Sequence, residues 1–214
     1  MSLADRLEAC HSSVVHDVMK EMGLPIRVLP RTICGLEPWM KVAGPVFTVR
    51  GRPDPALDRH TSLFEWAGVL SKSPPGHVVV CQPQDDIRAL FGGLSAEALK
   101  IKGVRGYIVD GGCRDIQAIV DQRFPVFARY ATPIDIVCAW RAEAFGEPVV
   151  IGGHPVHPED MVLADRDGVI LIEGAAAEEV IAAAEAKIAT EGEMVKAIRA
   201  GMDPQEAYMK YRVF

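Results

Sequence analysis

The segment Tyr107–Asp115 constrains the fold most, because an apolar run stops abruptly at an acidic residue and two glycines. The run itself is typical of a buried strand, and the Asp-Gly-Gly that follows it is typical of a tight loop. Beyond Asp115, apolar residues return at helical spacing, at Ile116, Ile119 and Val120. The segment therefore predicts a strand, a loop and the start of a helix.

This loop is also the first candidate for a functional site. Loops that follow the carboxyl ends of strands in α/β sheets are preferred ligand positions. Two carboxylates, Asp110 and Asp115, lie here beside the guanidinium of Arg114, and such crowding of charge favours a site that uses a cation or an anionic ligand. A structural alternative stays open, in which Asp115 caps the following helix and Arg114 is its solvated neighbour.

A second glycine pair precedes another predicted helix. The sequence Phe91-Gly92-Gly93-Leu94-Ser95 opens a helical pattern that continues to Ile101. Free backbone N–H groups and the positive end of the helix dipole make such a start a good seat for a carboxylate. Close packing of the helix against a strand is the alternative explanation of these glycines.

Periodicity predicts helices and strands in mixed order along the rest of the chain. We expect helices at residues 2–22, 60–71, 90–101, 116–122 and from 175 onward, the last interrupted at Gly192. We expect strands at residues 42–50, 77–81, 107–109, 125–130, 148–151, 161–164 and 169–173. Residues 133–146 are expected to be a connection, and the segment from His154 to His157 a surface turn. Asp203-Pro204 is predicted to begin a final short helix.

Composition limits the class of protein. The net charge of −6 gives no broad attraction to nucleic acid or to an anionic membrane, so neither is expected as a partner. The five cysteines are odd in number and widely spaced, which favours a reducing compartment over a disulfide framework. No run approaches the about 20 apolar residues of a membrane span, and the N-terminus has no apolar signal region. A soluble cytoplasmic protein is expected.

The residues of both glycine segments carry a resemblance to a known family. The loop Asp110–Asp115, the helix start Phe91–Ser95 and Lys102-Gly103-Val104 resemble the signature of the RraA-like family, which includes class II 4-hydroxy-4-methyl-2-oxoglutarate and 4-carboxy-4-hydroxy-2-oxoadipate aldolases. Further segments match the family in the same order along the chain; they are residues 43–50, 124–129, 132–133 and 164–169. The resemblance therefore spans about Ser12 to Glu173.

The resemblance implies a fold and an assembly. The expected fold is α/β, with three β/β/α layers of the phosphohistidine-domain-like kind, assembled as a homotrimer or homohexamer. Residues 1–174 are expected to form the RraA-like domain, including the N-terminal helix. Residues 175–214 are expected to form a helical arm that packs on the same domain or on a neighbouring subunit. Its apolar tail, with Tyr208, Tyr211 and Phe214, favours contact with another subunit.

The resemblance also implies a function. The implied activity is that of a divalent-metal-dependent lyase that acts on small 2-oxo acids. Its reactions would be retro-aldol cleavage of 4-hydroxy-2-oxo diacids to pyruvate and decarboxylation of oxaloacetate. Both reactions pass through pyruvate enolate, whose negative charge requires an electrophile. The alternative is a non-catalytic regulator of the RraA type, which binds an RNA-decay enzyme.

Residue roles follow from the same resemblance. Asp115 is expected to hold Mg²⁺, Mn²⁺ or another divalent cation, and Arg114 to act as a catalytic and substrate-binding residue at the C2 oxygen. The helix start, Gly92, Gly93, Leu94 and Ser95, is expected to bind the pyruvyl carboxylate. Many aldolase members carry an acidic residue where this chain has Gly93, so the resemblance does not identify the residue that donates the proton to the enolate. Asp110 is the expected catalytic replacement, with Asp85 and Asp86 as alternatives.

Overall fold

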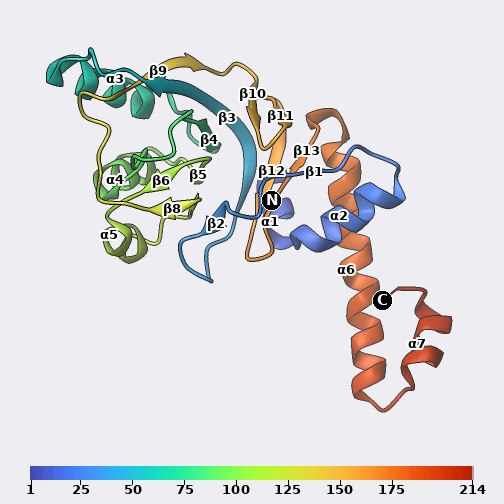
Figure 1. Cartoon of the computed structure of the whole chain (residues 1–214). Helices are drawn as coiled ribbons and strands as arrows, with labels where there is room; N and C mark the ends of the chain where they lie inside the picture. Colours follow the sequence, from blue (N-terminus) through green and yellow to red (C-terminus); the bar gives the residue numbers. More distant parts are fainter. Residues whose placement is uncertain (214) are drawn as a thin grey trace.

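Strand β3, Val42–Pro53, is the strand around which the sheet is built. In the computed structural model, which describes residues 1–213, its beginning pairs antiparallel with β12, Met161–Ala164, and its middle pairs parallel with β4, Val78–Gln82. Its end pairs antiparallel with β9, Trp140–Phe145, after a shift of register between Arg50 and Gly51. One long, curved strand therefore belongs to two half-sheets (Figure 1).

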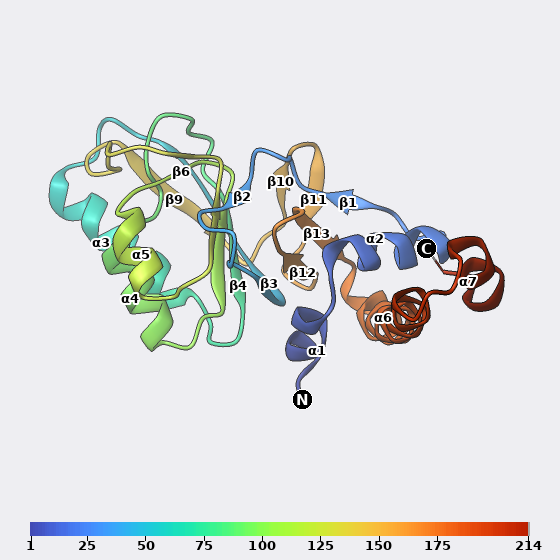
Figure 2. The ribbon, with the colours of Figure 1, turned by 90° about the horizontal axis from the view of Figure 1, so that it is seen from below.

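The half-sheet on one side of β3 is mainly parallel. The strand order β3-β4-β5-β7 continues the sheet, with β5 at Gly106–Val109 and β7 at Val126–Ala128, and β2, Cys34–Gly35, pairs antiparallel at the edge. Parallel neighbours require crossover connections. Three helices supply them and lie together on one side of this half-sheet (Figures 1 and 2); they are α3 (Arg59–Lys72), α4 (Gly93–Ile101) and α5 (Ile116–Asp121).

The half-sheet on the other side of β3 is antiparallel and is covered on both faces. It contains β12, β13 (Val169–Ile172) and β1 (Arg27–Val28). Alternate residues of β12 and β13 face opposite ways. Val162 and Leu171 join the main core with the parallel strands, whereas Leu163 and Ile170 join a second core.

The second core is completed by helices from both ends of the chain. They are α1 (Leu3–Ala9), α2 (Ser12–Glu21) and the first half of α6 (Ala177–Arg199). Two β layers and the layer of α3, α4 and α5 confirm the predicted α/β, β/β/α arrangement, and these terminal helices form a further layer (Figure 2). The far end of α6 carries α7, Pro204–Tyr211, away from the sheet (Figure 1).

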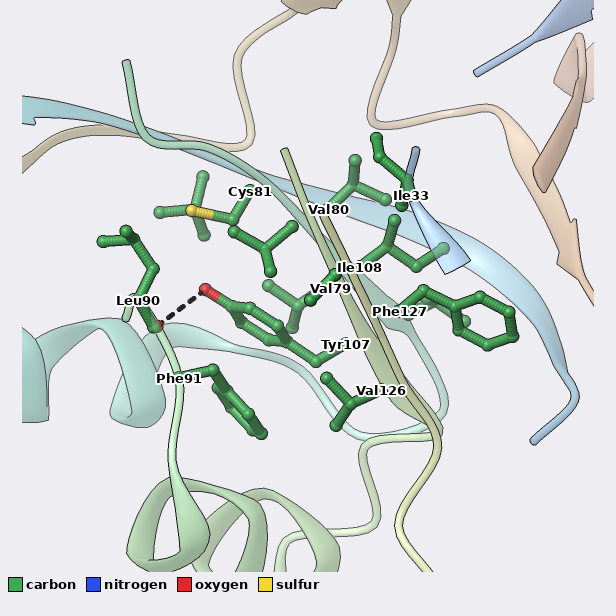
Figure 3. Packing of buried hydrophobic residues seen from close by; sticks show 14 of the residues in the cluster. Ile33, Val79, Val80, Cys81, Leu90, Phe91, Tyr107, Ile108, Val126 and Phe127 are labelled. Atoms are coloured by element: carbon green, nitrogen blue, oxygen red, sulfur yellow. Dashed lines mark hydrogen bonds between the residues drawn. The ribbon is translucent and has the colours of Figure 1, made fainter. Parts of the chain in front are cut away.

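The core under the strand ends fixes the chain that leads into α4. All four residues of β5 are buried, and the hydroxyl of Tyr107 donates a hydrogen bond to the carbonyl of Leu90 at 3.4 Å (Figure 3). The ring of Phe91 stacks on Tyr107 with 4.0 Å between the ring centroids. These buried contacts hold the segment before Gly92 against the end of β5.

Several predicted elements differ from the observed ones. The predicted N-terminal helix is two helices, because the backbone N–H and hydroxyl of Ser12 bind the carboxylate of Asp165 at 2.8 and 2.6 Å. That contact begins a new helix at Ser12. The long helix α6 runs through Gly192 without the predicted interruption. The predicted final helix is confirmed, since the Asp203 side chain caps α7 by accepting from the N–H groups of Gln205 and Glu206.

Two segments that were predicted without strands contain them. Trp140–Phe145 forms β9 on the end of β3, and His154–Val156 forms β11 in a hairpin with β10, Val149–Ile151. The remaining short elements are β6 (Gly112–Cys113), β8 (Tyr130–Ala131) and a 3-10 turn at Gly174–Ala176. In the part of the chain described, no helix has the length and apolar character to cross a membrane.

Candidate active site

A pocket of about 150 Å³ lies where the two glycine segments meet. It is bounded by α3, by the start of α4, by the loop before α5 and by the turn at residues 135–137. Its lining includes Gly92, Leu94 and Ser95 together with Arg114 and Asp115. Five of the seven predicted site residues therefore line one pocket, although 14 residues separate the motifs Phe91–Ser95 and Asp110–Asp115 along the chain.

Backbone hydrogen bonds join the two segments below this pocket. The N–H of Leu90 donates to the carbonyl of Gly112, and the N–H of Arg114 donates to the carbonyl of Phe91, each at 2.9 Å. The close approach explains Gly112, because a Cβ atom there would lie 2.5 Å from the Tyr130 ring. Gly112 is thus required for the close approach of two segments of the same chain, and not for a left-handed turn.

Asp115 occupies the N-cap position of α5 but does not cap that helix with its side chain. Its carboxylate Oδ2 instead accepts a hydrogen bond from the N–H of Gly93, the first residue of α4, at 3.1 Å. The backbone of Asp115 is left-handed, with φ of 56°, a conformation that costs free energy for a residue with a Cβ atom. The simple capping alternative is therefore wrong for this carboxylate.

Arg114 lies between two carboxylates. Its Nε is 3.7 Å from Asp115 Oδ2, and its NH1 is 3.5 Å from Asp135 Oδ2. The guanidinium is partly exposed and faces the pocket, so its donors can also reach a ligand. Asp135 was not predicted as a site residue, because an aspartate in a loop has no local pattern that separates a functional group from a turn. It does serve a turn as well, accepting from the N–H of Val137 at 3.1 Å.

The start of α4 supplies backbone donors to the same pocket. The first N–H groups of a helix have no intrahelical acceptor. The N–H of Gly93 already donates a hydrogen bond to Asp115. Leu94 and Ser95 follow in the first turn and line the pocket. The Ser95 hydroxyl accepts a hydrogen bond from the indole N–H of Trp66 at 3.0 Å, and this ties α3 to α4. Trp66 lies within the helix predicted at residues 60–71 but was not predicted as a site residue.

The remaining acidic candidates lie elsewhere. Asp110 is not among the residues that line the pocket; its carboxylate lies 3.6 Å from Arg129, and burial raises its pKa. Asp85 is buried and is held by Arg88 at 2.7 Å. Burial alone would raise the pKa of Asp85, but hydrogen bonds from the Arg88 and Ile87 N–H groups and from the Arg88 side chain lower it. Asp85 therefore has a structural role.

The donors present are compatible with a weakly held hard cation. Within residues 1–213, no three His, Cys, Asp or Glu side chains are grouped as a metal site. Mg²⁺ is commonly held by one or two carboxylates, with oxygens of the substrate and waters completing the shell. Asp115 offers one half-exposed carboxylate at the pocket, next to free helix amides. This oxygen chemistry fits Mg²⁺ or Mn²⁺ and does not fit a sulfur- or imidazole-based site.

Known proteins resemble this chain over most of its length. A family model for RraA-like proteins, described as Aldolase/RraA, matches residues 12–171. A protein of Halalkalibacterium halodurans named "Putative 4-hydroxy-4-methyl-2-oxoglutarate aldolase" is 30% identical over 186 residues, which are 85% of this chain and 83% of that protein.

Solved structures show the same fold. An uncharacterized protein of Pseudomonas syringae superposes with a TM-score of 0.84 at 23% identity, covering 96% of both chains. Streptomyces coelicolor RraAS2, described as an unusual member of the RNase ES inhibitor RraA protein family, superposes with a TM-score of 0.74 at 25% identity. The match covers 94% of this chain and 96% of that one.

Proposed function

Because this chain belongs to the RraA-like family, we propose that it is a pyruvate-forming lyase that cleaves 4-hydroxy-2-oxo acids by retro-aldol reaction. The RraA-like fold expected from the sequence is confirmed by the same comparison and by the solved neighbours. The proposal is carried by one observation, the pocket that gathers the Arg114 guanidinium, the Asp115 carboxylate and the first-turn amides of α4.

Each group in the pocket has a separate task in this proposal. The N–H groups of Leu94 and Ser95 donate to the carboxylate of the substrate, where the positive end of the α4 dipole adds to the attraction. Arg114 donates to the C2 oxygen and stabilises it most when that oxygen gains the charge of an enolate. Asp115 holds a divalent cation, Mg²⁺ or Mn²⁺, which when bound polarises the 2-oxo group as a Lewis acid.

Asp135 and Gly93 set the positions of these groups. Asp135 anchors the far side of the Arg114 guanidinium, and the Gly93 N–H fixes one oxygen of Asp115. A site is effective when its donors are already oriented before charge develops on the substrate. The left-handed backbone at Asp115 is consistent with such orientation, since strained residues concentrate where a function requires them.

A direct test is release of pyruvate, measured with a coupled dehydrogenase, from a panel of oxo acids with and without Mg²⁺ or Mn²⁺. The panel contains 4-hydroxy-4-methyl-2-oxoglutarate, after the name of the Halalkalibacterium halodurans relative, and oxaloacetate, whose decarboxylation passes through the same enolate. We expect cation-dependent release from at least one of these acids. Absence of release from these two acids and from the monoanionic 4-hydroxy-5-methyl-2-oxohexanoate, with either cation, rejects the lyase.

A second candidate function is supported by the description of the Streptomyces coelicolor neighbour, which is that of an RNase ES inhibitor family member. In that function the chain binds an RNA-decay enzyme and does no chemistry. The Arg114-Asp115 pair favours the lyase, because a purely regulatory surface has no need of an oriented carboxylate in a pocket. Inhibition of an RNase E-type enzyme that is unchanged by Arg114→Lys, together with no pyruvate release, would support the regulator.

A further inference from the structure

Part of the pocket wall is apolar. Leu63 and Trp66 project from α3, and Ile136 and Val137 follow from the turn before β9. Ile136 is buried in the main core, and Trp66 packs edge-on against Trp140 with 6.0 Å between the ring centroids. Ile136 and Trp66 are therefore held in place, and together with Val137 and the more exposed Leu63 they present a hydrocarbon surface to a ligand whose polar end lies at Arg114.

Charge in the pocket is arranged for one anionic group only. Among the pocket-lining residues, all of which lie in the described part of the chain, Arg114 is the single cationic side chain. Its guanidinium already faces two carboxylates, Asp115 and Asp135. A second carboxylate on a ligand would meet the apolar wall and the negative charge of Asp135, with no cation of its own.

We infer that, within the function proposed above, the preferred substrates are monoanionic 4-hydroxy-2-oxo acids with a short apolar group on C4, in place of diacids. In their cleavage the C3–C4 bond breaks, and the 4-hydroxyl loses its proton as C4 becomes an aldehyde carbonyl. The bonding pair moves to C3, which takes up a proton to give pyruvate. The pocket volume of about 150 Å³ must also hold the pyruvyl part of the substrate, so the space left for the C4 substituent favours a short group.

Two substrates of nearly equal shape test the inference. 4-Hydroxy-5-methyl-2-oxohexanoate carries an isopropyl group where 4-hydroxy-2-oxoglutarate carries a carboxylate, and both release pyruvate. We expect kcat/KM to be at least about 10-fold higher for the isopropyl compound, since differences of that size come from a single group in an apolar pocket. Equal or higher kcat/KM for the diacid overturns the inference and leaves the proposed lyase intact.

Binding gives a readout that does not depend on turnover. 5-Methyl-2-oxohexanoate and 2-oxoglutarate differ in the same way but lack the 4-hydroxyl, so neither can undergo the cleavage. Trp66, one of three tryptophans, lines the pocket, so the change in the protein's tryptophan fluorescence on titration gives their dissociation constants. Tighter binding of 5-methyl-2-oxohexanoate supports the inferred selectivity even if no lyase activity is found, in which case only the proposed function fails. Equal or tighter binding of 2-oxoglutarate overturns the inference.

Variants locate the selectivity in the pocket. Leu63→Lys places an ammonium group on the apolar wall, and we expect it to shift the kcat/KM ratio and the Kd ratio at least about 10-fold toward the diacid. Leu63→Met keeps the wall apolar, so the preference for the isopropyl compound should persist. Phe64→Lys adds the same charge one residue along, on a side chain that does not line the pocket, and is the matched control.

Asp135 supplies the second test of the electrostatic argument. Asp135→Asn removes the negative charge and keeps the shape, so both ratios should move toward the diacid. A loss of activity through displacement of Arg114 would affect both substrates and would leave their ratio unchanged. Ratios that stay constant in both Asp135→Asn and Leu63→Lys contradict the assignment of this wall to the C4 substituent.

Discussion

The carboxylate of Asp115 accepts a hydrogen bond from the backbone N–H of Gly93 at 3.1 Å, although the two residues begin different helices. The bond directs Asp115 away from its own helix and toward the pocket. It also ties the start of α4 to the loop before α5, in addition to the backbone hydrogen bonds that join the two segments at Leu90–Gly112 and Phe91–Arg114.

Replacing Asp115 with Asn separates its chemical role from its structural one. The Asn side-chain carbonyl can still accept from the Gly93 N–H, and Asn tolerates a left-handed backbone. We expect the free energy of unfolding to fall by about 1 kcal/mol or less, while cation-dependent pyruvate release is abolished. Urea denaturation and the coupled assay measure the two quantities. Asp121→Asn, on the exposed end of α5, should leave both nearly unchanged; activity lost only in proportion to unfolding would indicate a structural role alone.

Gly92 is predicted to be required for activity, because a side chain there would displace the Asp115 carboxylate. A Cβ atom at Gly92 would lie 2.7 Å from Asp115 Oδ2 and 3.2 Å from the Cγ of Arg114, so both side chains must shift. We expect Gly92→Ala to lower kcat by about 10-fold or more and stability by about 1 to 3 kcal/mol. Gly68→Ala is the control, since no atom lies within 4 Å of its Cβ position in α3 and it should stabilise the helix by about 0.5 to 1 kcal/mol. A fully active Gly92→Ala variant would contradict the proposed position of Asp115.

Arg114→Lys should act on the chemical step more than on binding. Lysine keeps the charge but loses the planar fork of donors that can serve the C2 oxygen and Asp135 together. We expect kcat for pyruvate release to fall by about 10²-fold or more, in the range found when one oxyanion donor is removed. The melting temperature should change little, because the side chain is partly exposed. Arg129→Lys alters the pair with Asp110 outside the pocket; an equal loss there would instead point to Asp110.

Burial should protect the thiols in the core from alkylation. Burial raises the pKa of both Cys81 and Cys113 to about 12 and raises that of Cys10, so little thiolate forms on them at pH 8. Cys34 and Cys138 are exposed. We expect iodoacetamide at pH 8 to modify these two in the folded protein and all five after denaturation, as measured by mass spectrometry of peptides. Modification of Cys113 as fast as that of Cys34 in the folded protein would show that the loop beside the pocket opens readily.

The C-terminal arm is predicted to contact another subunit in a homotrimer or homohexamer. Ala207 of α7 is buried within the chain, whereas Tyr208 and Met209 are largely exposed and present an apolar surface. Phe214, named in the sequence-based prediction, lies outside the described residues. Deleting the residues after Gly201 should lower the number of subunits per particle, obtained by sedimentation equilibrium as the particle mass divided by the mass of the truncated chain. The same number of subunits as in the full chain would remove the arm from the subunit contact.

The sequence by itself determined most of the helices and strands and the two motifs of the candidate site. The β-branched run from Val78 to Val80 is a fully buried strand, and Asp203-Pro204 begins a helix, because these signals act over a few residues. The family resemblance rests on the same kind of local pattern, and the matching family model confirms it.

Only the tertiary structure decided how distant groups meet. The break before Ser12 depends on Asp165, 153 residues away, and β9 forms because the end of β3 offers it an edge. The Asp115 side chain accepts a hydrogen bond from the N–H of Gly93 and does not cap its own helix, and Asp135 lies at the pocket beside Arg114. Each of these contacts is set by how elements distant in the sequence pack together in the fold. Residue spacing along the chain carries no information about which carboxylate that packing brings to which donor.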